Sequence, residues 1–405
     1  MKSILTDKTI VLGVSGGIAA YKSVELLRLM KKEEARVRVL MTQNAMRFIG
    51  PLTFEALSEQ RVCADLFEEG NNAAIGHIAW AQAADAVVLA PATANIIGKL
   101  AGGIADDAIS TFMMAVTAPR MICPSMNTHM FESAAVQRNI EVLQKDGMFV
   151  LTPGAGALAC GTTGPGRLPE PEEIVDRLKK LLSSKDFRGK TVLVTAGPTQ
   201  EPIDPVRYIS NPSSGKMGYE IARAAEHRGA EVVLIAGPTP LPDPFQVHVV
   251  RIRTAAEMAE AVFDNASKAD IIIKAAAVSD YRPQRAAEHK MKKDQEALRL
   301  HLVRNRDILA ELGKTGTSAV LVGFAAETQS LAQNATAKLK AKNLDMIVGN
   351  IVGEKDSGFE ANTNVVSFFY KDGSHEKLPM MGKNEVAQEL LDRILQRMAH
   401  KNSDA

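Results

Sequence analysis

Residues 9–41 read TIVLGVSGGIAAYKSVELLRLMKKEEARVRVLM, and this stretch decides the fold. A continuous apolar run at Thr9–Val14 is followed by an SGG turn, the helical pattern of Ile18–Lys32 and a second apolar run at Val37–Met41. Uninterrupted apolar strands are typical of parallel sheets buried on both faces, whereas strands with one exposed face alternate. The stretch therefore predicts a strand, a glycine turn, a helix and a second, parallel strand.

The second half of the chain repeats this plan. Thr191–Thr195 predicts a strand, Gly215–Arg228 a helix and Glu231–Ile235 the next strand. Further buried strands are expected at Ala86–Ala90, Met121–Cys123, Ile271–Lys274, Ala319–Gly323 and Met346–Val348. A polar stretch, 183–190, follows the helical pattern of Glu172–Leu182 and is the best linker candidate. We expect an α/β protein with two Rossmann-like domains, 1–188 and 189–405, each a mainly parallel sheet flanked by helices.

The composition agrees with two domains and excludes several classes of protein. At about 150 residues per domain, 405 residues predict two or three domains. A net charge of +1 gives no attraction to nucleic acid or to a membrane surface. No apolar run approaches the roughly 18 residues of a membrane span, and the first residues lead into a strand rather than a signal peptide. Three cysteines without a C-x-x-C pair favour a reducing cytoplasm over a disulfide framework or a zinc–thiolate site.

The glycine turn after the first strand is a candidate phosphate site. Gly16 and Gly17 let the backbone approach a ligand at the start of a helix, where amide groups and the helix dipole attract anions. The turn is not G-x-G-x-x-G, because Ser15 replaces the second glycine. The second strand runs into Thr42 rather than into the acidic residue that holds a dinucleotide ribose. A mononucleotide therefore fits better than NAD, and a plain helix-capping turn is the alternative.

Four further segments of the first half carry residues suited to a ligand. PATAN (91–95) and PSMN (124–127) follow predicted strands, and their small and amide side chains suit a flat ring and a carboxylate. His77 lies at the start of an expected helix and Cys160 in the glycine-rich run ACGTTGPGR (159–167), which predicts a mobile loop. Separately, His77 could be a capping histidine, Asn127 a turn residue and Cys160 an inert buried thiol.

The second half combines a long connection with several basic elements. Ala196–Ser214 is far longer than an ordinary strand-to-helix turn and ends in SSGK at a helix start, which offers hydroxyls, amides and a charge to an anion. Lys338 and Lys342 are four residues apart and share a helix face. Together with Asp280, these features predict a nucleoside triphosphate site, and solvated lysine faces are the alternative.

The first half resembles the homo-oligomeric flavin-containing cysteine decarboxylases. The resemblance rests on SGG, PATAN, PSMNTHM and ACGTTGPGR, in this order across residues 9–167, with Phe131 where the family often has Trp. It implies that His77 is catalytic, that Asn127 binds the substrate carboxylate and that Cys160 donates a proton. It also implies FMN contacts from Ser15, Gly16, Gly17, Thr42, Ala92, Thr93 and Asn95.

The second half is similar to bacterial phosphopantothenate–cysteine ligases across residues 190–395. TAGPTQEPIDPVRYISNPSSGKMG, AAAVSDYRP, KMKK, GFAAET and KLKAKNLD match in order. The similarity implies that Arg207 and Asn211 serve the acyl intermediate, that Lys290 is catalytic and that Mg²⁺ accompanies CTP. Its implied CTP contacts are Asp280, Lys290, Asn305, Arg306, Asp307, Ile308, Phe324, Lys338 and Lys342. Arg306 replaces the usual proline of that family, and the preference for CTP over ATP follows from the resemblance alone.

Together the two resemblances imply a bifunctional enzyme of coenzyme A biosynthesis. It would ligate 4'-phosphopantothenate to cysteine and then decarboxylate the product to 4'-phosphopantetheine. They also imply a cytoplasmic homo-oligomer, a dodecamer built from flavin-domain trimers and ligase-domain dimers. The alternatives are a flavoprotein acting on peptide cysteines, a regulatory flavin-fold protein that binds a partner, and a nicotinamide oxidoreductase.

Overall fold

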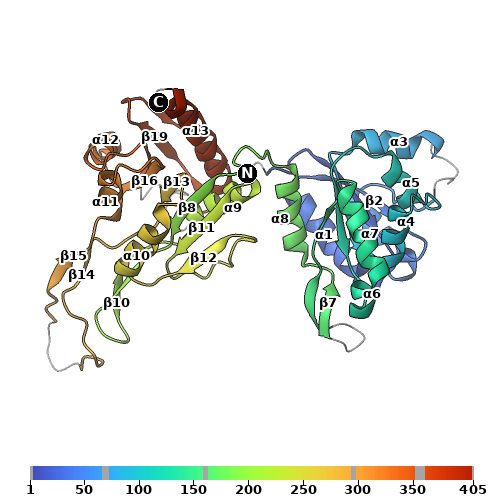
Figure 1. Cartoon of the computed structure of the whole chain (residues 1–405), viewed down its shortest axis with the longest axis horizontal. Helices are drawn as coiled ribbons and strands as arrows, with labels where there is room; N and C mark the ends of the chain where they lie inside the picture. Colours follow the sequence, from blue (N-terminus) through green and yellow to red (C-terminus); the bar gives the residue numbers. More distant parts are fainter. Residues whose placement is uncertain (1–2, 66–72, 158–162, 293–297, 352–360, 404–405) are drawn as a thin grey trace. The chain divides into compact units, whose positions relative to one another are not determined.

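The computed structural model describes residues 3–65, 73–157, 163–292, 298–351 and 361–403. The chain divides into two compact units, one ending at Ser183 and the other beginning at Ser184 (Figure 1). Each unit encloses its own hydrophobic clusters on the two faces of a central sheet. The two units are therefore described separately.

The N-terminal unit is built on a five-stranded parallel sheet in the order β2-β1-β3-β4-β5. Its strands are β1 (Thr9–Val14), β2 (Arg36–Met41), β3 (Ala86–Ala92), β4 (Arg120–Pro124) and β5 (Phe149–Val150). One face packs against α1 (Lys22–Lys32), α2 (Pro51–Ser58) and α8 (Pro171–Leu182). The other packs against α3 (Ala73–Ala83), α4 (Ala94–Ala101), α5 (Ala108–Ala115) and α7 (Ala134–Lys145). Short helices η1 (Ile18–Tyr21), η2 (Ala45–Arg47) and α6 (Thr128–Glu132) complete the unit.

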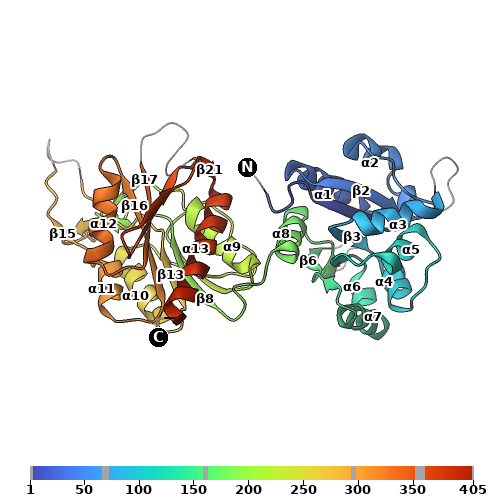
Figure 2. The same ribbon diagram turned by 90° about the horizontal axis from the view of Figure 1, so that it is seen from above.

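The C-terminal unit contains an eight-stranded sheet in the order β12-β11-β8-β13-β16-β17-β19-β20 (Figure 2). Its strands are β8 (Thr191–Ala196), β11 (Glu231–Ala236), β12 (His248–Arg251), β13 (Ile271–Lys274), β16 (Val320–Glu327), β17 (Met346–Ile351), β19 (Val366–Tyr370) and β20 (His375–Lys377). All pairs are parallel except those made by β19 and β20. One face packs against α9 (Lys216–His227) and α13 (Lys383–Ser403), the other against α10 (Ala255–Ala266), α11 (Ile308–Lys314) and α12 (Leu331–Ala341). The predicted α/β fold class is confirmed.

The glycine-rich run around Cys160 differs from the expected loop. Residues 154–157 form β6 (Gly154–Ala157), which pairs antiparallel with β7 (Thr163–Arg167). Gly166 has φ 132°, and a Cβ there would lie 2.2 Å from the carbonyl oxygen of Met126. The Met126 N–H donates to the Gly166 carbonyl at 2.9 Å. The loop prediction is therefore wrong for residues 163–167, since the glycine allows a strand to approach the 124–127 segment. Cys160 lies outside the described residues.

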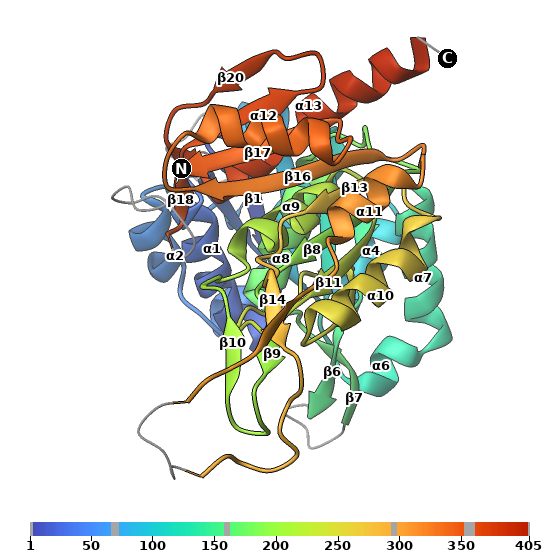
Figure 3. The same ribbon diagram turned by 90° about the vertical axis from the view of Figure 1, so that its left-hand side faces the viewer.

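The long connection after β8 also has secondary structure of its own. It contains the hairpin of β9 (Gln200–Pro202) and β10 (Tyr208–Ser210). A second pair, β14 (Tyr281–Pro283) with β15 (Leu302–Arg304), lies beside it in Figure 3, and the Ala287 N–H donates to the Ile203 carbonyl at 2.9 Å. A third small pair joins β18 (Thr363–Asn364) to β21 (Met381–Gly382).

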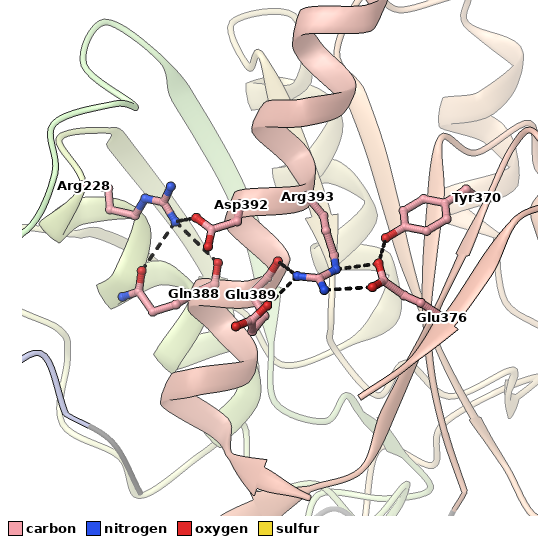
Figure 4. Close-up of polar contacts among 7 residues, drawn as sticks. All are labelled: Arg228, Tyr370, Glu376, Gln388, Glu389, Asp392 and Arg393. Atoms are coloured by element: carbon pink, nitrogen blue, oxygen red, sulfur yellow. Dashed lines mark hydrogen bonds and ion pairs between the residues drawn. The ribbon is translucent and has the colours of Figure 1, made fainter. Parts of the chain in front are cut away.

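Ion pairs fasten α13 to the rest of its unit (Figure 4). Arg393 donates to both carboxylate oxygens of Glu376 at 2.6 and 2.9 Å and to Glu389 at 2.6 Å. The Glu376 carboxylate also accepts a hydrogen bond from the Tyr370 hydroxyl. At the end of α9, Arg228 pairs with Asp392 at 2.6 Å. The helix is thus fixed to β19, β20 and α9 by charged groups as well as by its apolar face.

Candidate active sites of the two units

In the N-terminal unit, the strand order reverses between β1 and β3. Ser15, directly after β1, donates its hydroxyl hydrogen to the Pro91 carbonyl at 2.7 Å, and its oxygen accepts the Thr93 N–H at 3.0 Å. The Ser15 side chain is buried, so these bonds join the carboxyl ends of the two strands. Open α/β sheets bind their ligands at such reversal points.

A cavity of about 790 Å³ opens at this edge of the sheet. The predicted residues that line it are Ser15, Gly16, Gly17, Thr42, Thr93, Asn95 and Asn127. A Cβ at Gly16 would lie 2.4 Å from the Cβ of Asn44, so the backbone at Gly16 makes a close approach that other residues cannot. Ala92 is fully buried in β3, outside this lining, and its carbonyl accepts the Ser125 N–H at 2.9 Å. The volume lies within the usual range for small-molecule sites.

Asn127 caps α6 and lines the same cavity. Its side-chain oxygen accepts the His129 N–H at 2.9 Å, which fixes the orientation of the amide group. The amide NH₂ is the end of this side chain that can donate to a carboxylate. Asn127 is therefore a turn residue, which was the alternative interpretation of the sequence, and it also lines the cavity. His77 is the fifth residue of α3, and its side chain lies outside the described part of the structure.

The cavity also holds charged residues for which the sequence predicted no role. Lys99 donates to Asp106 at 2.6 Å and Asp107 at 2.8 Å, and these bonds raise the pKa of Lys99. Lys99 and Asp107 both belong to the lining, as does Arg167, the last residue of ACGTTGPGR. Lys99 lies on α4 and Asp107 caps α5, so only the folded chain brings them together.

In the C-terminal unit, a cavity of about 520 Å³ lies at the carboxyl edge of the sheet, where the order reverses between β8 and β13. The predicted residues in its lining are Asn211, Asp280, Asn305, Arg306, Asp307, Ile308, Phe324, Lys338 and Lys342. The lining also includes Lys216, which is the lysine of the predicted SSGK anion segment. It further includes Lys274, Ser279 and Lys383, for which the sequence predicted no role. Lys338 lies on α12 and Lys342 caps its C-terminal end. Both line this cavity, as their spacing of four residues suggested.

Hydrogen bonds fix the acidic and amide groups of this cavity. Asn305 donates its side-chain amide to the Ser279 carbonyl at 2.8 Å, and Asn211 donates to the Val278 carbonyl at 3.1 Å. Asp307 caps α11 by accepting the Ala310 N–H at 3.1 Å. The Ser279 hydroxyl is buried and has no hydrogen-bond partner among the described residues, so a ligand oxygen or amine could satisfy it.

Lysines and arginines surround these groups. Lys342 pairs with Asp307 at 2.8 Å and Lys338 with Glu327 at 2.7 Å. Burial raises the pKa of Asp307, but the bonds from Lys342 and Ala310 outweigh it and hold this pKa below its usual range. Lys383 is buried at the start of α13, and burial together with the nearby charge of Lys216 lowers its pKa to about 8.

Two predicted ligase residues do not line the cavity. Arg207 donates through Nε to the buried carboxylate of Asp204 at 2.9 Å and through Nη2 to the Met291 carbonyl at 3.0 Å. Arg207 holds the pKa of Asp204 well below its usual range. Lys290 is exposed, next to Met291, and outside the lining of the cavity. The hairpin of β9 and β10 thus ties Arg207 to the Lys290 segment instead.

Comparison with known proteins gives matches to both units. The family described as "Flavoprotein" matches residues 2–183, and the "DNA/pantothenate metabolism flavoprotein C-terminal domain" matches residues 187–398. The coenzyme A biosynthesis bifunctional protein CoaBC of Bacillus subtilis (strain 168) is 48% identical over 395 residues, which is 96% of this chain and 97% of the relative. CoaBC of Escherichia coli (strain K12) is 44% identical, over 98% of this chain and 99% of that protein.

The chain belongs to the CoaBC family of bifunctional coenzyme A biosynthesis proteins. It is therefore an enzyme with two activities, a flavoprotein decarboxylase and a ligase, and the family predicted from the sequence motifs is confirmed. Among solved structures, the C-terminal domain of a CoaBC protein is 42% identical, covers 54% of this chain and 100% of that chain, and has a TM-score of 0.47.

Membrane spans and metal clusters are both missing from the described residues. None of the helices in that part of the chain combines the length and apolarity needed to cross a membrane. Within the same residues, no three His, Cys, Asp or Glu side chains are grouped so as to hold a metal ion.

Proposed function

We propose that residues 189–405 ligate 4'-phosphopantothenate to cysteine with CTP and that residues 1–188 decarboxylate the product with FMN. The observation that carries this proposal is the gathering of most residues of each predicted set around a cavity at the reversal point of its own sheet. The small residues and close glycine backbone of the N-terminal cavity fit a flat cofactor with a phosphate. The basic residues of the C-terminal cavity fit a triphosphate.

In the ligase, the carboxylate of phosphopantothenate attacks the α-phosphorus of CTP, and pyrophosphate leaves. Lys338 and Lys342 neutralise charge on the phosphates as this bond breaks. Mg²⁺ bound to the nucleotide would supply further positive charge there. The cysteine amine then attacks the acyl carbon of the mixed anhydride, loses a proton and displaces CMP. Asn211 donates a hydrogen bond to the acyl carbonyl, and the family resemblance assigns Lys290 as the catalytic lysine.

In the decarboxylase, bound FMN supplies reversible two-electron oxidation of the substrate carbon next to the thiol, with no net gain or loss of electrons. The glycine turn and Thr93 hold the cofactor's phosphate. Asn127 donates its amide to the carboxylate that is lost as CO₂. His77 removes the substrate thiol proton, and Cys160 returns a proton to carbon at the end.

The test is one incubation in which both activities are followed. The purified protein, supplied with phosphopantothenate, cysteine and CTP or ATP, should release pyrophosphate continuously only when cysteine is present, and CO₂ should follow. Without cysteine, at most one equivalent of pyrophosphate per site is expected, from formation of the mixed anhydride. Continuous pyrophosphate release without cysteine, or faster release with ATP, would contradict the ligase assignment. CO₂ from a cysteine-ending peptide, but not from phosphopantothenoylcysteine, would favour the peptide-acting alternative instead.

The same proposal extends to assembly and location. We infer a cytoplasmic homo-oligomer, because the family resemblance implies trimers of the flavin domain and dimers of the ligase domain. Twelve copies satisfy both symmetries. Mass photometry at nanomolar concentration should show the dodecamer, and a monomer at all concentrations would contradict it.

A further inference from the structure

Lys274 lies at the base of the ligase cavity, on the strand next to the reversal point. It is the last residue of β13, in register with Thr195 of β8 and Gly323 of β16. Its side chain is 8% exposed and belongs to the cavity lining. A lysine nine-tenths buried in an otherwise apolar strand is rare unless the ammonium has a partner.

The surroundings of Lys274 provide no carboxylate contact among the described residues. Its Nζ donates to the sulfur of Met258 on α10 at 3.4 Å, and a thioether is a weak acceptor. The charged groups that act on it are Asp307, ahead of α11, and Lys342, at the end of α12. Asp307 is already engaged with Lys342 at 2.8 Å. The described part of the protein therefore leaves the buried amine of a cavity-lining residue without a strong acceptor.

We propose that Lys274 is a nucleotide-binding residue of the ligase, whose amine takes up a proton when the triphosphate enters the cavity and then pairs with its phosphates. This inference rests on the proposed nucleotide site. The anionic ligand supplies the negative charge that the protein does not, so the ammonium is favoured only in the complex. Burial lowers the pKa of Lys274 to about 7, with Asp307 opposing and Lys342 reinforcing this effect. The free enzyme thus holds the amine largely neutral above pH 7.

Proton uptake on binding is measured by calorimetric titration of the full-length protein with CTP in two buffers of different ionisation enthalpy. At pH 8 we expect an uptake approaching about one proton, and at pH 6 much less, because the amine is already charged there. CTP affinity should accordingly fall as pH rises above 7. Lys274→Met should lose this uptake and raise the Kd about 10–100-fold. Lys274→Arg, which stays charged, should lose the uptake but keep most of the affinity.

Stability separates this role from a structural one. Removing a buried amine that lacks a strong acceptor should raise the melting temperature of Lys274→Met without nucleotide, while the CTP-induced increase shrinks. Lys340→Met, an exposed residue of α12, is the control and should leave binding and uptake unchanged. If Lys274→Met melts lower, or binds CTP with wild-type affinity and uptake, the inference is overturned. A wild-type protein that binds no CTP would instead overturn the proposed ligase function, before any variant is made.

Discussion

The two cavities occupy the same place in related sheets but differ in charge. The lining of the ligase cavity has six basic side chains, Lys216, Lys274, Arg306, Lys338, Lys342 and Lys383, against the two acidic ones of Asp280 and Asp307. The lining of the flavoprotein cavity has three, Lys22, Lys99 and Arg167, against Asp107. The flavoprotein cavity is shaped mainly by close approach of the backbone, and the ligase cavity mainly by cationic side chains. The carboxyl edge of a parallel sheet thus fixes where a ligand binds, and the loops decide which ligand.

The comparison predicts that adding a side chain to the glycine turn should abolish decarboxylation but not ligation. In Gly16→Ala, the new Cβ would lie 2.4 Å from the Cβ of Asn44 and 2.7 Å from its carbonyl carbon, so backbone must move. We expect the purified variant to lose both flavin absorbance and decarboxylation, while CTP-dependent pyrophosphate release continues. Gly50→Ala is the matched control, since nothing lies within 4 Å of its added Cβ. A yellow Gly16→Ala protein with normal CO₂ release would show that close approach does not define this cavity.

Lysine substitutions test the second half of the comparison. Lys342→Met removes the partner of Asp307 and a cation of the cavity, so the Kd for CTP should rise about 10–100-fold. Lys338→Met should have a smaller effect, because Lys338 is 45% exposed and paired with Glu327. Calorimetry with CTP measures both, and decarboxylation of supplied phosphopantothenoylcysteine should stay at the wild-type rate. Equal increases in the Kd for CTP from the two variants would mean that side-chain exposure does not determine how much each lysine contributes to CTP binding.

The separate cores predict that the units can be destabilised one at a time. Arg393→Met leaves Glu376 without its bidentate partner and should cost about 1–2 kcal/mol. The melting temperature of the C-terminal unit should fall by about 2–8 °C. Arg397→Met, whose partner Asp372 is 53% exposed, should cost less. Flavin release on heating should be unchanged in both variants, and a parallel fall in that temperature would show that the units do not unfold separately.

The Arg393–Glu376 pair predicts that the stability of the C-terminal unit depends on pH. The hydrogen bond from Arg393 lowers the pKa of Glu376, so the carboxylate binds fewer protons in the folded state than in the unfolded state. The contribution of the pair is therefore complete at neutral pH and is lost as the pH falls through the folded-state pKa. The melting temperatures of wild type and Arg393→Met should begin to converge as the pH falls below the ordinary glutamate pKa of about 4.3. The Arg393 guanidinium also lies 4.8 Å from the centre of the Phe368 ring. A difference in melting temperature that stays constant down to pH 3 would therefore assign the loss of stability to packing against Phe368 instead.

Local sequence pattern predicted the sheets well, because continuous apolar runs depend on burial alone. Ile271–Lys274 has the predicted bounds, and most other strands differ from prediction by one to four residues at an end. The β6–β7 hairpin was missed, since its reason is the long-range contact of Gly166 with Met126. Composition alone cannot distinguish a glycine that gives freedom from one that allows close packing.

The candidate sites were predictable where a motif gathers several ligand residues, and not where a single side chain acts from within an element. Lys274 ends a strand whose other residues are core, so its sequence context gives no hint of a cavity. Arg207 was expected at the ligase cavity, but the nearby Asp204 engages it through the turn that joins β9 and β10. Such competition between local and distant partners appears only in the folded chain.

The smallest predicted effect concerns Arg306, which stands where the ligase family often has proline. Its guanidinium pairs with Glu311 at 2.6 Å and lies 5.1 Å from the centre of the Phe263 ring. These contacts direct the charge toward α11 and α10 rather than toward a nucleotide. Arg306→Ala should therefore change the Kd for CTP by less than about 2-fold and lower stability by less than about 1 kcal/mol, because the pair is exposed. A loss of affinity as large as that of Lys342→Met would mean that Arg306 turns toward bound nucleotide, and a residue that departs from the family's usual pattern would then be one of the cations that bind it.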